Sequence, residues 1–463
     1  MHDVIDVDYL IIGAGTTGMG FADSLLTASD ATMAIVDRHD RPGGHWNDAY
    51  PFVRLHQPAA LYGVNSHPLG SGEKDEVGLN KGLYELASGQ EVLNHFDFVM
   101  QHRFLPSGRV QYFPMCEVDD AGTITSRLSG QRVEVRARKT VDGTYSQVSV
   151  PSTHRRQFDV AEGVTCGPLN ELPRLAPAHS QFVVIGAGKT GMDACLWLLA
   201  NGADPDAIRW VMPRDAWLLN RANFQPGMEF LARGANSIAD QVEALALAES
   251  VDDLFQRLEA KGEVLRVDPS ITPTAYHCAT VSDDELEALR QIGDVIRLGR
   301  VERIETDRIV LEGGEVVSSP DALYVDCSAI GIPNRQARPV FEGDRITLQF
   351  VRFCQPAFSA SLIGHVEASF SDDDSKNGLC APIAPASVPF DYVRMVSVEL
   401  ANRHRWSKDP VVATWIAQSR LDGFTSRLGS LTGSETEVFA HLQRYGEHVV
   451  GAVKNVKRLL ATQ

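Results

Sequence analysis

Two copies of one glycine-rich segment constrain this chain more than any other feature of its sequence. Gly-Ala-Gly-x-Thr-Gly-Met stands at residues 13–19 and again at residues 186–192, each time after an apolar run and before a helix-like segment. A strand, a glycine turn and a helix N-terminus form a cradle for a pyrophosphate, because glycines allow close backbone approach and free N–H groups meet the negative charge. The repeat therefore predicts an α/β fold with two Rossmann-like dinucleotide-binding units. The candidate binding residues are Gly13, Gly15, Thr17 and Gly18 in the first copy and Gly186, Gly188, Lys189, Thr190 and Gly191 in the second.

The charge and hydropathy of the chain limit its partners. The 463 residues carry a formal net charge of −17, whereas binding to nucleic acid or to an anionic membrane requires a basic surface. No apolar stretch approaches the ~20 residues that cross a bilayer. The N-terminal apolar segment follows three aspartates and runs into the first glycine turn, so we expect a strand there rather than a signal peptide. The sequence predicts a cytoplasmic protein with a small-molecule partner and no nucleic-acid or membrane partner.

The cysteines favour a reducing compartment. Seven cysteines are scattered along the chain, and no Cys-x-x-Cys or other close pair occurs among them. Flavoprotein disulfide reductases share the plan of two dinucleotide sites but need a redox-active pair, so we expect this chain to lie outside that class. The acidic run at residues 372–374 has no neighbouring histidine, and adjacent acids rarely converge on one ion. We therefore predict no metal site.

The residue that closes the second strand of each unit indicates which dinucleotide binds there. In the first unit this residue is Asp37, and a carboxylate at that place accepts hydrogen bonds from ribose hydroxyls and repels a 2′-phosphate. In the second unit the strand ends at Arg214, Arg221 follows, and Lys189 adds positive charge within the turn. Arginine binds phosphate through paired, charge-assisted hydrogen bonds. The sequence therefore predicts FAD or NAD at the first site and NADPH at the second. The alternative for the second site is NADH, with Arg214 as an ordinary surface arginine.

The segment after Asp37 narrows the choice at the first site. Arg38 comes next, and Gly43-Gly44-His45-Trp46 follows after a short stretch. This order of an acid and a Gly-Gly-x-Trp resembles the flavin-containing monooxygenases and Baeyer–Villiger monooxygenases, as do the segments 50–58 and 324–331. The resemblance covers most of residues 8–58 and 180–331. It implies a glutathione-reductase-like two-domain flavoprotein with FAD at the first site, where Arg38, Gly44 and Trp46 are among the candidate contacts.

The expected domain organisation follows from the two units and the proline-rich run between them. Residues 1–178 are predicted to form the first part of the FAD-binding domain, residues 179–321 the NADPH-binding domain, and residues 322–463 the second part of the FAD-binding domain with a C-terminal helical region. Residues 228–262 have an acidic, helical pattern and are interpreted as a solvated insert. Residues 434–461 form an amphipathic helix, whose apolar face predicts a core contact or a homodimer contact.

Two features depart from the pattern of the family. His56 stands where the flavin-containing monooxygenases have an asparagine, which is expected to help hold the peroxide formed at the flavin. A histidine there can donate a hydrogen bond or shuttle a proton, since its unperturbed pKa is ~6.5, and Gln57 is a second candidate donor. The alternatives are a loop histidine satisfied by backbone and a solvated glutamine. The fingerprint Phe-x-Gly-x-x-x-His-x-x-x-Tyr/Trp is missing from residues 158–177, which indicates a divergent branch.

The resemblance implies an oxidoreductase that uses FAD, NADPH and O2. NADPH would pass a hydride to the flavin, and a C4a-(hydro)peroxyflavin would transfer one oxygen atom to a nitrogen or sulfur centre of a small molecule. His56 and Gln57 are the candidate catalytic residues. Two alternatives stay open: an NADPH-dependent flavin dehydrogenase or reductase without oxygen transfer, and a non-catalytic flavin-binding sensor.

Overall fold

The first glycine turn opens an α/β unit built on a largely parallel sheet. The computed structural model describes residues 3–462. The strands of this sheet run in the order β19-β20-β6-β1-β2-β3, and β4 and β5 extend it beside β6. The central pairs, β1 with β2 and β1 with β6, are parallel, as a Rossmann-like unit requires. The strand bounds are β1 Asp3–Ile12, β2 Met33–Val36, β3 Val110–Phe113, β4 Cys116–Val118, β5 Thr123–Ser126, β6 Arg132–Asp142, β19 Phe341–Glu342 and β20 Arg345–Thr347.

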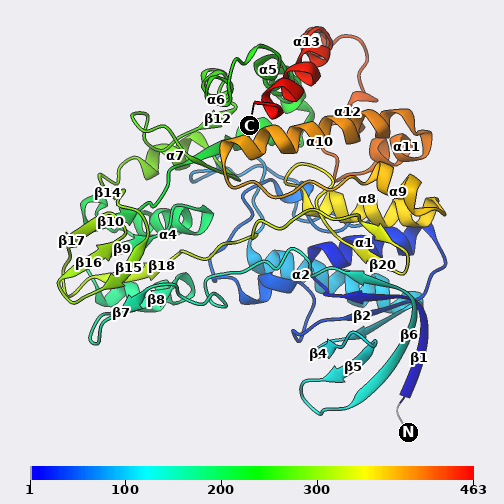
Figure 1. The fold of residues 1–463 in the computed structure, drawn as a ribbon, viewed down its shortest axis with the longest axis horizontal. Helices are drawn as coiled ribbons and strands as arrows, with labels where there is room; N and C mark the ends of the chain where they lie inside the picture. The colour runs from blue at the N-terminus through cyan, green and yellow to red at the C-terminus, as the bar shows by residue number, and fades with distance from the viewer. Residues whose placement is uncertain (1–2, 463) are drawn as a thin grey trace.

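The second glycine turn opens a second unit, to the left of the first in Figure 1. Its five strands are parallel, in the order β14-β10-β9-β18-β8. Two small sheets accompany it, ordered β12-β11-β13 and β17-β16-β15-β7. The bounds are β7 Asp159–Val160, β8 Cys166–Pro168, β9 Phe182–Ile185, β10 Ile208–Val211, β11 Ala216–Asn220, β12 Val264–Leu265, β13 Ala275–Val281, β14 Asp294–Ile296, β15 Val301–Ile304, β16 Arg308–Leu311, β17 Gly314–Val317 and β18 Leu323–Asp326.

The sheets correct both domain boundaries expected from the sequence. β7 and β8 lie before residue 179 but pair with β15 and β18 of the second unit. β18 lies after residue 321 but pairs with β9 in the same sheet. The second unit therefore spans about residues 159–326. The prolines that suggested a linker near residue 178 lie inside it, because short helical turns at residues 169–178 accommodate them.

Helices pack on the sheets of both units, and a further group of helices forms a layer above the two units in Figure 1. The helix bounds are α1 Thr16–Ala28, α2 Gly89–Val99, α3 Leu172–Leu175, α4 Lys189–Ala200, α5 Leu231–Leu247, α6 Val251–Ala260, α7 Asp283–Leu289, α8 Pro356–Ser369, α9 Asp373–Leu379, α10 Pro389–Lys408, α11 Pro410–Gln418, α12 Thr425–Leu428 and α13 Thr436–Leu460. No helix within residues 3–462 is both long enough and apolar enough to cross a membrane.

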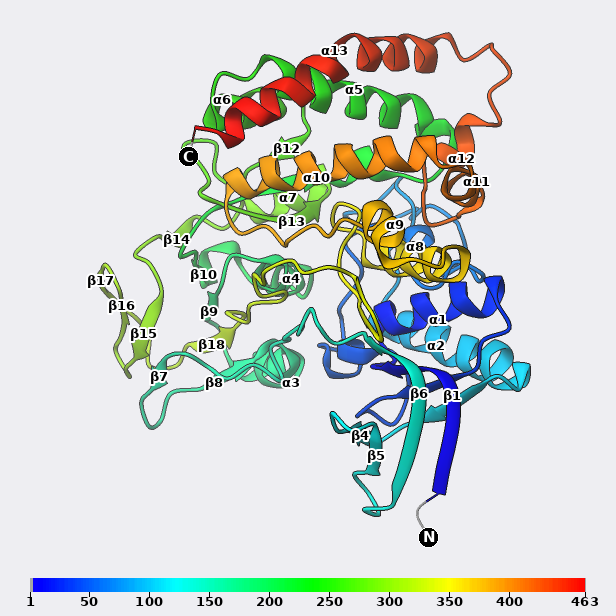
Figure 2. The ribbon, with the colours of Figure 1, turned by 45° about the vertical axis from the view of Figure 1, so that its right-hand side comes forward.

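The segment 228–262 is helical as predicted, but it is not a solvated insert. Its helices α5 and α6 pack with α10 and α13 in one layer (Figure 2). Phe255 of α6 is buried against Trp217, Tyr276 and Tyr392 in a shared core. The apolar side of α13 packs mainly on α5, so the core interpretation of this helix is confirmed. The acidic pattern misled because not all of its acids face solvent: Asp240 of α5 is buried and forms ion pairs with Lys261 and with Arg444 of α13.

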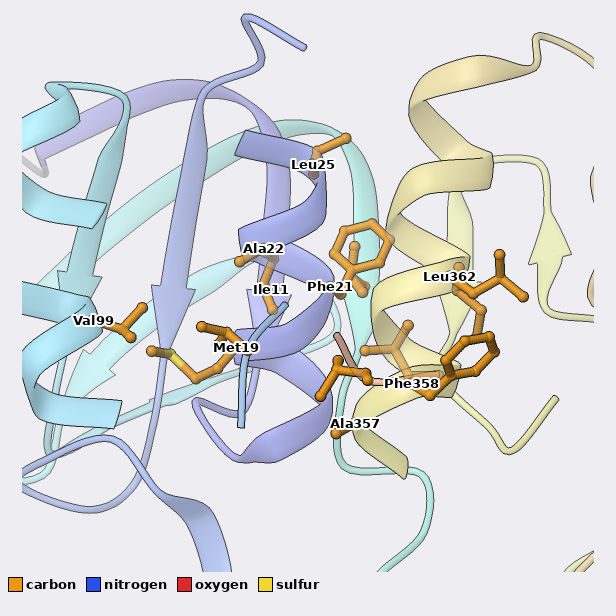
Figure 3. Close-up of a cluster of buried hydrophobic side chains, with 14 of the residues drawn as sticks. Ile11, Met19, Phe21, Ala22, Leu25, Val99, Ala357, Phe358 and Leu362 are labelled. Atoms are coloured by element: carbon orange, nitrogen blue, oxygen red, sulfur yellow. The ribbon is translucent and has the colours of Figure 1, made fainter. Parts of the chain in front are cut away.

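Helix α1 is held between the first sheet and α8. Figure 3 shows Phe21 facing the side chains of Phe358 and Leu362, and Met19 facing Val99 on the other side. Two glycines allow the close approach of these helices: a Cβ on Gly364 would lie closer than 3.0 Å to the carbonyl oxygen of Phe21, and a Cβ on Gly20 would lie 3.3 Å from Ser361 Oγ. The C-terminal third of the chain thereby fixes the helix that begins at the first glycine turn.

A buried ionic cluster ties the same segments together. Glu367 of α8 accepts from Lys376 Nζ at Oε2 (2.7 Å) and from the hydroxyl of Tyr9 at Oε1 (2.7 Å), and Lys139 Nζ lies 2.8 Å from the same Oε1. The side chains of Glu367 and Lys376 are each 3% exposed. Burial and the Glu367 carboxylate raise the pKa of Tyr9, so its hydroxyl stays a donor. Each charge of the cluster needs its partners, because an unpaired buried charge is costly.

We expect Lys376→Met to lower the free energy of unfolding by about 3–5 kcal/mol, because it leaves Glu367 buried with one cation fewer. Urea unfolding followed by circular dichroism measures the change. The control is Arg338→Ala, which removes a half-exposed ion pair with Glu342 and should cost less than about 1 kcal/mol. Equal effects of the two variants would contradict the structural role of the cluster.

Candidate active site: two glycine turns and the residues between them

The first glycine turn has the geometry of a pyrophosphate cradle. Gly13 has φ 95°, and a Cβ on Gly18 would lie closer than 3.0 Å to the carbonyl oxygen of Gly13. Gly15 is the N-cap of α1, and no side chain caps this helix. The N–H groups of its first turn thus lack a side-chain acceptor and are available to an anion. The residues fit a bound pyrophosphate.

Asp37 pins the first glycine turn from the end of β2. The backbone N–H of Ala14 donates to Asp37 Oδ2 at 2.6 Å, and the backbone N–H and Nδ1 of His39 each lie 2.8 Å from Asp37 Oδ1. The hydrogen bonds to Asp37 and to Asp48 raise the pKa of His39 above its usual value. The contact of Asp37 with a ribose stays a prediction, and the structure gives this carboxylate a second task in shaping the turn.

The Gly-Gly-x-Trp segment lies directly on the first glycine turn. Gly44 has φ 56°, and a Cβ there would lie 2.9 Å from the Cα of Gly15. Trp46 is buried, and its Nε1 donates to the hydroxyl of Tyr62 at 2.9 Å, which in turn lies 2.5 Å from Thr16 Oγ1. Trp46 therefore acts through Tyr62 on the N-terminus of α1. The sequence offered no signal for Tyr62, since nothing in its neighbourhood forms a motif.

Two further residues proposed as FAD contacts have protein partners. Thr17 Oγ1 donates to the carbonyl oxygen of Gly143 at 2.9 Å, which joins α1 to the end of β6. Arg38 is exposed on the surface after β2, and its guanidinium lies 3.7 Å from Asp48. The hydroxyl of Thr17 is used within the fold, whereas the Arg38 side chain remains accessible from solvent.

The second glycine turn repeats the packing of the first. A Cβ on Gly191 would lie closer than 3.0 Å to the carbonyl oxygen of Gly186, and Gly186 itself has φ 127° and packs against Cys327. Trp210 Nε1 donates to the carbonyl oxygen of Gly186 at 2.8 Å from the neighbouring strand. Gly188 is the N-cap of α4, again without a side-chain cap, and a Cβ on it would meet no protein atom within 4 Å. This turn also fits a pyrophosphate.

The first turn of α4 carries a charge cluster. Lys189 pairs with Asp193 one helical turn later, and the hydroxyl of Tyr50 donates to the other oxygen of Asp193 at 2.5 Å. Burial, followed by the nearby Asp193 carboxylate, raises the pKa of Tyr50 well above its usual value. Thr190 is half-buried between them on the helix. Lys189 neutralises the acid nearest to the second turn, which is a condition for binding an anion there.

Arg214 and Arg221 have different surroundings, and the proposed phosphate role of Arg221 is wrong. Arg214 is exposed just after β10 and forms no hydrogen bond or ion pair with the residues that the structure describes. Arg221 is fully buried, and its guanidinium donates to the carbonyl oxygen of His56 at 3.1 Å, to Asn80 and to Glu285 at 2.6 Å. These partners occupy its donors, so it cannot reach a ligand phosphate.

His56 belongs to the first unit, and two residues of the second unit, Thr280 and Arg221, hydrogen-bond to it. Its Nδ1 accepts from the backbone N–H of Thr280 at 3.3 Å, which leaves the ring proton on Nε2. Burial, with smaller contributions from Lys189 and Arg221, lowers the pKa of His56 to about 3. The ring is therefore neutral at physiological pH and offers a hydrogen-bond donor. Gln57, next in the chain, is half-buried and makes no hydrogen bond within residues 3–462.

The fold also brings together two cysteines that are 76 residues apart. Cys278 of β13 and Cys354, just before α8, form a disulfide with a Cα–Cα distance of 6.5 Å. The sequence shows no close pair, and this separation is the reason that the pair was missed. The scattered cysteines, which favoured a reducing compartment, thus include one pair that is distant in the sequence and close in the fold. In the described part of the chain, no three side chains of His, Cys, Asp or Glu converge as metal ligands would.

Comparisons with known proteins agree with this arrangement. No protein-family model matches the chain. It is 48% identical over 446 residues to "Uncharacterized protein Rv2000" of Mycobacterium tuberculosis (strain ATCC 25618 / H37Rv), covering 96% of this chain and 81% of that protein. It is 22% identical over 406 residues to "Probable FAD-binding monooxygenase AlmA" of Acinetobacter baylyi, covering 79% of this chain and 78% of that protein.

Solved structures share its fold at low sequence identity. A polycyclic ketone monooxygenase from Thermothelomyces thermophila has a TM-score of 0.51 and 13% identity, covering 98% of this chain and 85% of that chain. A cyclohexanone monooxygenase in the rotated conformation has a TM-score of 0.51 and 12% identity, covering 97% and 99% of the two chains. The chain belongs to one family with the mycobacterial protein, and it shares the two-domain α/β fold of these monooxygenase structures.

The glycines of the second turn allow packing and ligand approach to be separated. We expect Gly191→Ala to lower the free energy of unfolding by about 2 kcal/mol or more, because its Cβ meets the carbonyl oxygen of Gly186. Gly188→Ala should change it by less than about 1 kcal/mol, since its backbone is extended and its Cβ meets open space.

Gly188→Ala should nevertheless weaken the binding of a dinucleotide, with NADP⁺ as the probe, about tenfold or more, because the added Cβ would project into the open space at the uncapped N-terminus of α4, where a pyrophosphate would bind. Urea unfolding and calorimetric titration measure the two quantities. A destabilised Gly188→Ala protein, or one with full affinity, would contradict this division of roles.

Proposed function

We propose that this protein is an FAD- and NADPH-dependent monooxygenase that oxygenates a small molecule at a nitrogen or sulfur centre. The observation that carries the proposal is the unequal pair of glycine turns: a buried carboxylate, Asp37, ends the second strand of the first unit, and an exposed, unpaired guanidinium, Arg214, ends that of the second. The similarity to the probable FAD-binding monooxygenase AlmA and to the cyclohexanone monooxygenase supports a flavin at one of them, and the carboxylate favours the first.

The residues around the first turn would hold FAD through backbone rather than side-chain donors. The uncapped N-terminus of α1 would face the phosphates, and Trp46 and Asp37 keep the turn in shape. The second turn would hold NADPH in the same way, with Arg214 on its 2′-phosphate and Lys189 balancing Asp193. When bound, the two cofactors supply hydride transfer to the flavin and its reaction with O2.

His56 would contribute a neutral donor at the junction of the two units. Its Nδ1 accepts a hydrogen bond from Thr280 of β13, so the ring proton is on Nε2 and is directed away from β13. The asparagine of the family offers an amide N–H and no proton to lose. A histidine with a pKa of about 3 behaves alike, because it stays neutral across the working pH range.

The replacement of that asparagine is also the observation that favours a second candidate function, an NADPH-dependent flavin dehydrogenase or reductase that never transfers oxygen. One experiment separates the functions. The protein, loaded with FAD, is mixed with NADPH without oxygen, and the loss of oxidised-flavin absorbance is followed. NADPH consumption and hydrogen peroxide release are then compared in air across a panel of amines and sulfides.

In a monooxygenase, NADPH removes the absorbance of the oxidised flavin. With a suitable substrate, the enzyme then releases less peroxide than the NADPH it consumes, and an oxygenated product forms. In a reductase, NADPH also removes the flavin absorbance, but no oxygenated product forms, and the peroxide released equals the NADPH consumed for every compound of the panel. If neither NADPH nor NADH removes the flavin absorbance, both enzymatic functions are wrong and the flavin-binding sensor is the remaining function. The proposed reaction partners are the small molecule and O2, in the cytoplasm.

The coenzyme preference depends on Arg214 in this proposal. We expect Arg214→Ala to lower kcat/KM for NADPH about 10- to 100-fold, because charge-assisted hydrogen bonds to a phosphate are lost. The same variant with NADH is the control and should change by less than about twofold, since NADH has no 2′-phosphate. A parallel loss with both coenzymes would show that the residue supports the fold rather than the phosphate.

The donor role of His56 predicts a specific pattern of variants. His56→Asn should keep the wild-type ratio of product to NADPH, because an amide offers the same acceptor and donor, whereas His56→Leu should lower it about tenfold or more. Because the ring is already neutral, the wild-type rate should show no inflection from His56 between about pH 5 and pH 9. An inflection that disappears in His56→Asn would contradict the neutral-donor role.

A further inference from the structure

The disulfide Cys278–Cys354 joins the two units at the place where His56 is held. Cys278 belongs to β13 of the second unit. Cys354 lies two residues before α8, the helix that packs on α1 of the first unit. Apart from the chain itself, this bond is the covalent link between these units within residues 3–462. It therefore restrains how the second glycine turn sits relative to the first.

The strand that carries Cys278 is distorted at that residue. Trp217 of β11 pairs with Tyr276 of β13, and Leu219 pairs with Thr280. The paired residues are thus two positions apart on β11 and four positions apart on β13. The additional residues form a bulge, and Cys278 within it has φ 57°. Cysteine adopts this left-handed region at a cost of about 1–3 kcal/mol, which persists only where the surroundings impose it.

Cys354 shows the same backbone feature on the other side. Its φ is 49°, and the turn that carries it is fixed by hydrogen bonds from Val351 and Arg352 to Ser359 Oγ and from Phe353 to Glu399. Arg352 is in turn buried in an ion pair with Asp422. The first unit thus presents Cys354 on a turn that hydrogen bonds fix, whereas Cys278 lies at the irregular step of the β11–β13 pairing.

The bulge ends at the residue that holds His56. Thr280, two residues after Cys278, donates its N–H to His56 Nδ1 at 3.3 Å, and its carbonyl oxygen accepts from Arg221 at 3.3 Å. The Thr280 hydroxyl donates to the carbonyl oxygen of Cys278 at 3.3 Å. A movement of Cys278 is therefore passed to the amide that selects the tautomer and orientation of the His56 ring.

We propose that Cys278–Cys354 is a redox-sensitive strap that positions His56: the closed disulfide holds the β13 bulge and its Thr280 amide against the ring, and opening of the disulfide releases both. The cysteines are positioning residues, because they act on His56 through Thr280. The strap itself is independent of the proposed monooxygenase function, whereas its effect on turnover rests on that function.

Opening occurs by thiol–disulfide exchange with a small-molecule thiol. The incoming thiolate attacks the sulfur of Cys354, which is the more exposed of the two, and Cys278 leaves. The hydroxyl of Tyr276 lies 3.9 Å from Cys278 Sγ and can donate a hydrogen bond to the leaving thiolate. A second thiol completes the exchange: two thiols give up two electrons and two protons and become a disulfide, and both cysteines end as thiols.

The test compares the full-length protein in three forms: oxidised with glutathione disulfide, reduced with dithiothreitol, and the double variant Cys278→Ala/Cys354→Ala. Thiol titration after denaturation should find five thiols in the oxidised protein and seven in the reduced one. Peptide mass spectrometry should recover Cys278 linked to Cys354. Hydrogen exchange at the Thr280 amide should rise about tenfold on reduction and return on reoxidation.

The double variant should exchange at the reduced rate and should not respond to dithiothreitol. The β18 amides serve as the control region and should be unchanged in all forms, because β18 is paired on both sides, between β9 and β8. Seven thiols after oxidation, or equal exchange at Thr280 in the oxidised and reduced proteins, would overturn the strap. Wild-type reduction needs no substitution, so poor folding of the variant does not leave the proposal untested.

The turnover arm separates this inference from the proposed function. With FAD and NADPH present, reduction of the strap should lower turnover several-fold and leave anaerobic reduction of the flavin unchanged. If the exchange at Thr280 responds but the protein oxidises no NADPH, the strap stands and the proposed function fails. If the protein shows turnover, but reduction of the disulfide changes neither the turnover rate nor the exchange of the Thr280 amide, the strap fails and the function stands.

Discussion

Both dinucleotide units depend on one contact, the approach of the third glycine of each motif to the carbonyl oxygen of the first. A Cβ on Gly18 or on Gly191 would lie closer than 3.0 Å to the oxygen of Gly13 or of Gly186. This contact sets the strand against the helix that follows it, and it aims the uncapped first turn of the helix at the ligand. Without it, the same residues would form a strand and a helix but not an anion site.

The remaining structure keeps these two helices in place by different means. α1 is enclosed between the first sheet and α8, and the buried pair Glu367–Lys376 fixes α8 to the strands beneath it. α4 packs on α7, and the indole N–H of Trp210 donates to the carbonyl oxygen of the first glycine of the second turn. Gly44 covers Gly15 in the first turn, whereas Gly188 is exposed and has no protein atom near its Cβ position, so the second turn is the more open of the two.

The sequence predicts what is local and misses what depends on distant partners. Two glycine motifs, each between a strand and a helix, are enough to predict both units, and α13 follows from its apolar period. Arg221 lay near the expected phosphate, but Asn80 and Glu285 bind it, and neither is near it in the sequence. The domain boundaries failed because β8 and β18 lie outside the second motif yet pair with its sheet. The Cys278–Cys354 pair was equally out of reach, since no spacing rule joins residues 76 positions apart.

The charges around the second turn are the reason that the proposed coenzyme preference depends on one arginine. Lys189 is paired with Asp193, and Arg221 with Glu285, so neither adds a net positive charge for a ligand. The backbone N–H groups of α4 attract any pyrophosphate, with or without a further phosphate on the ribose. Arg214, unlike Lys189 and Arg221, has no carboxylate partner within the described chain. The proposed preference for NADPH over NADH therefore has one physical source, and its expected loss on removal of that guanidinium follows from the pairing of the other two cations.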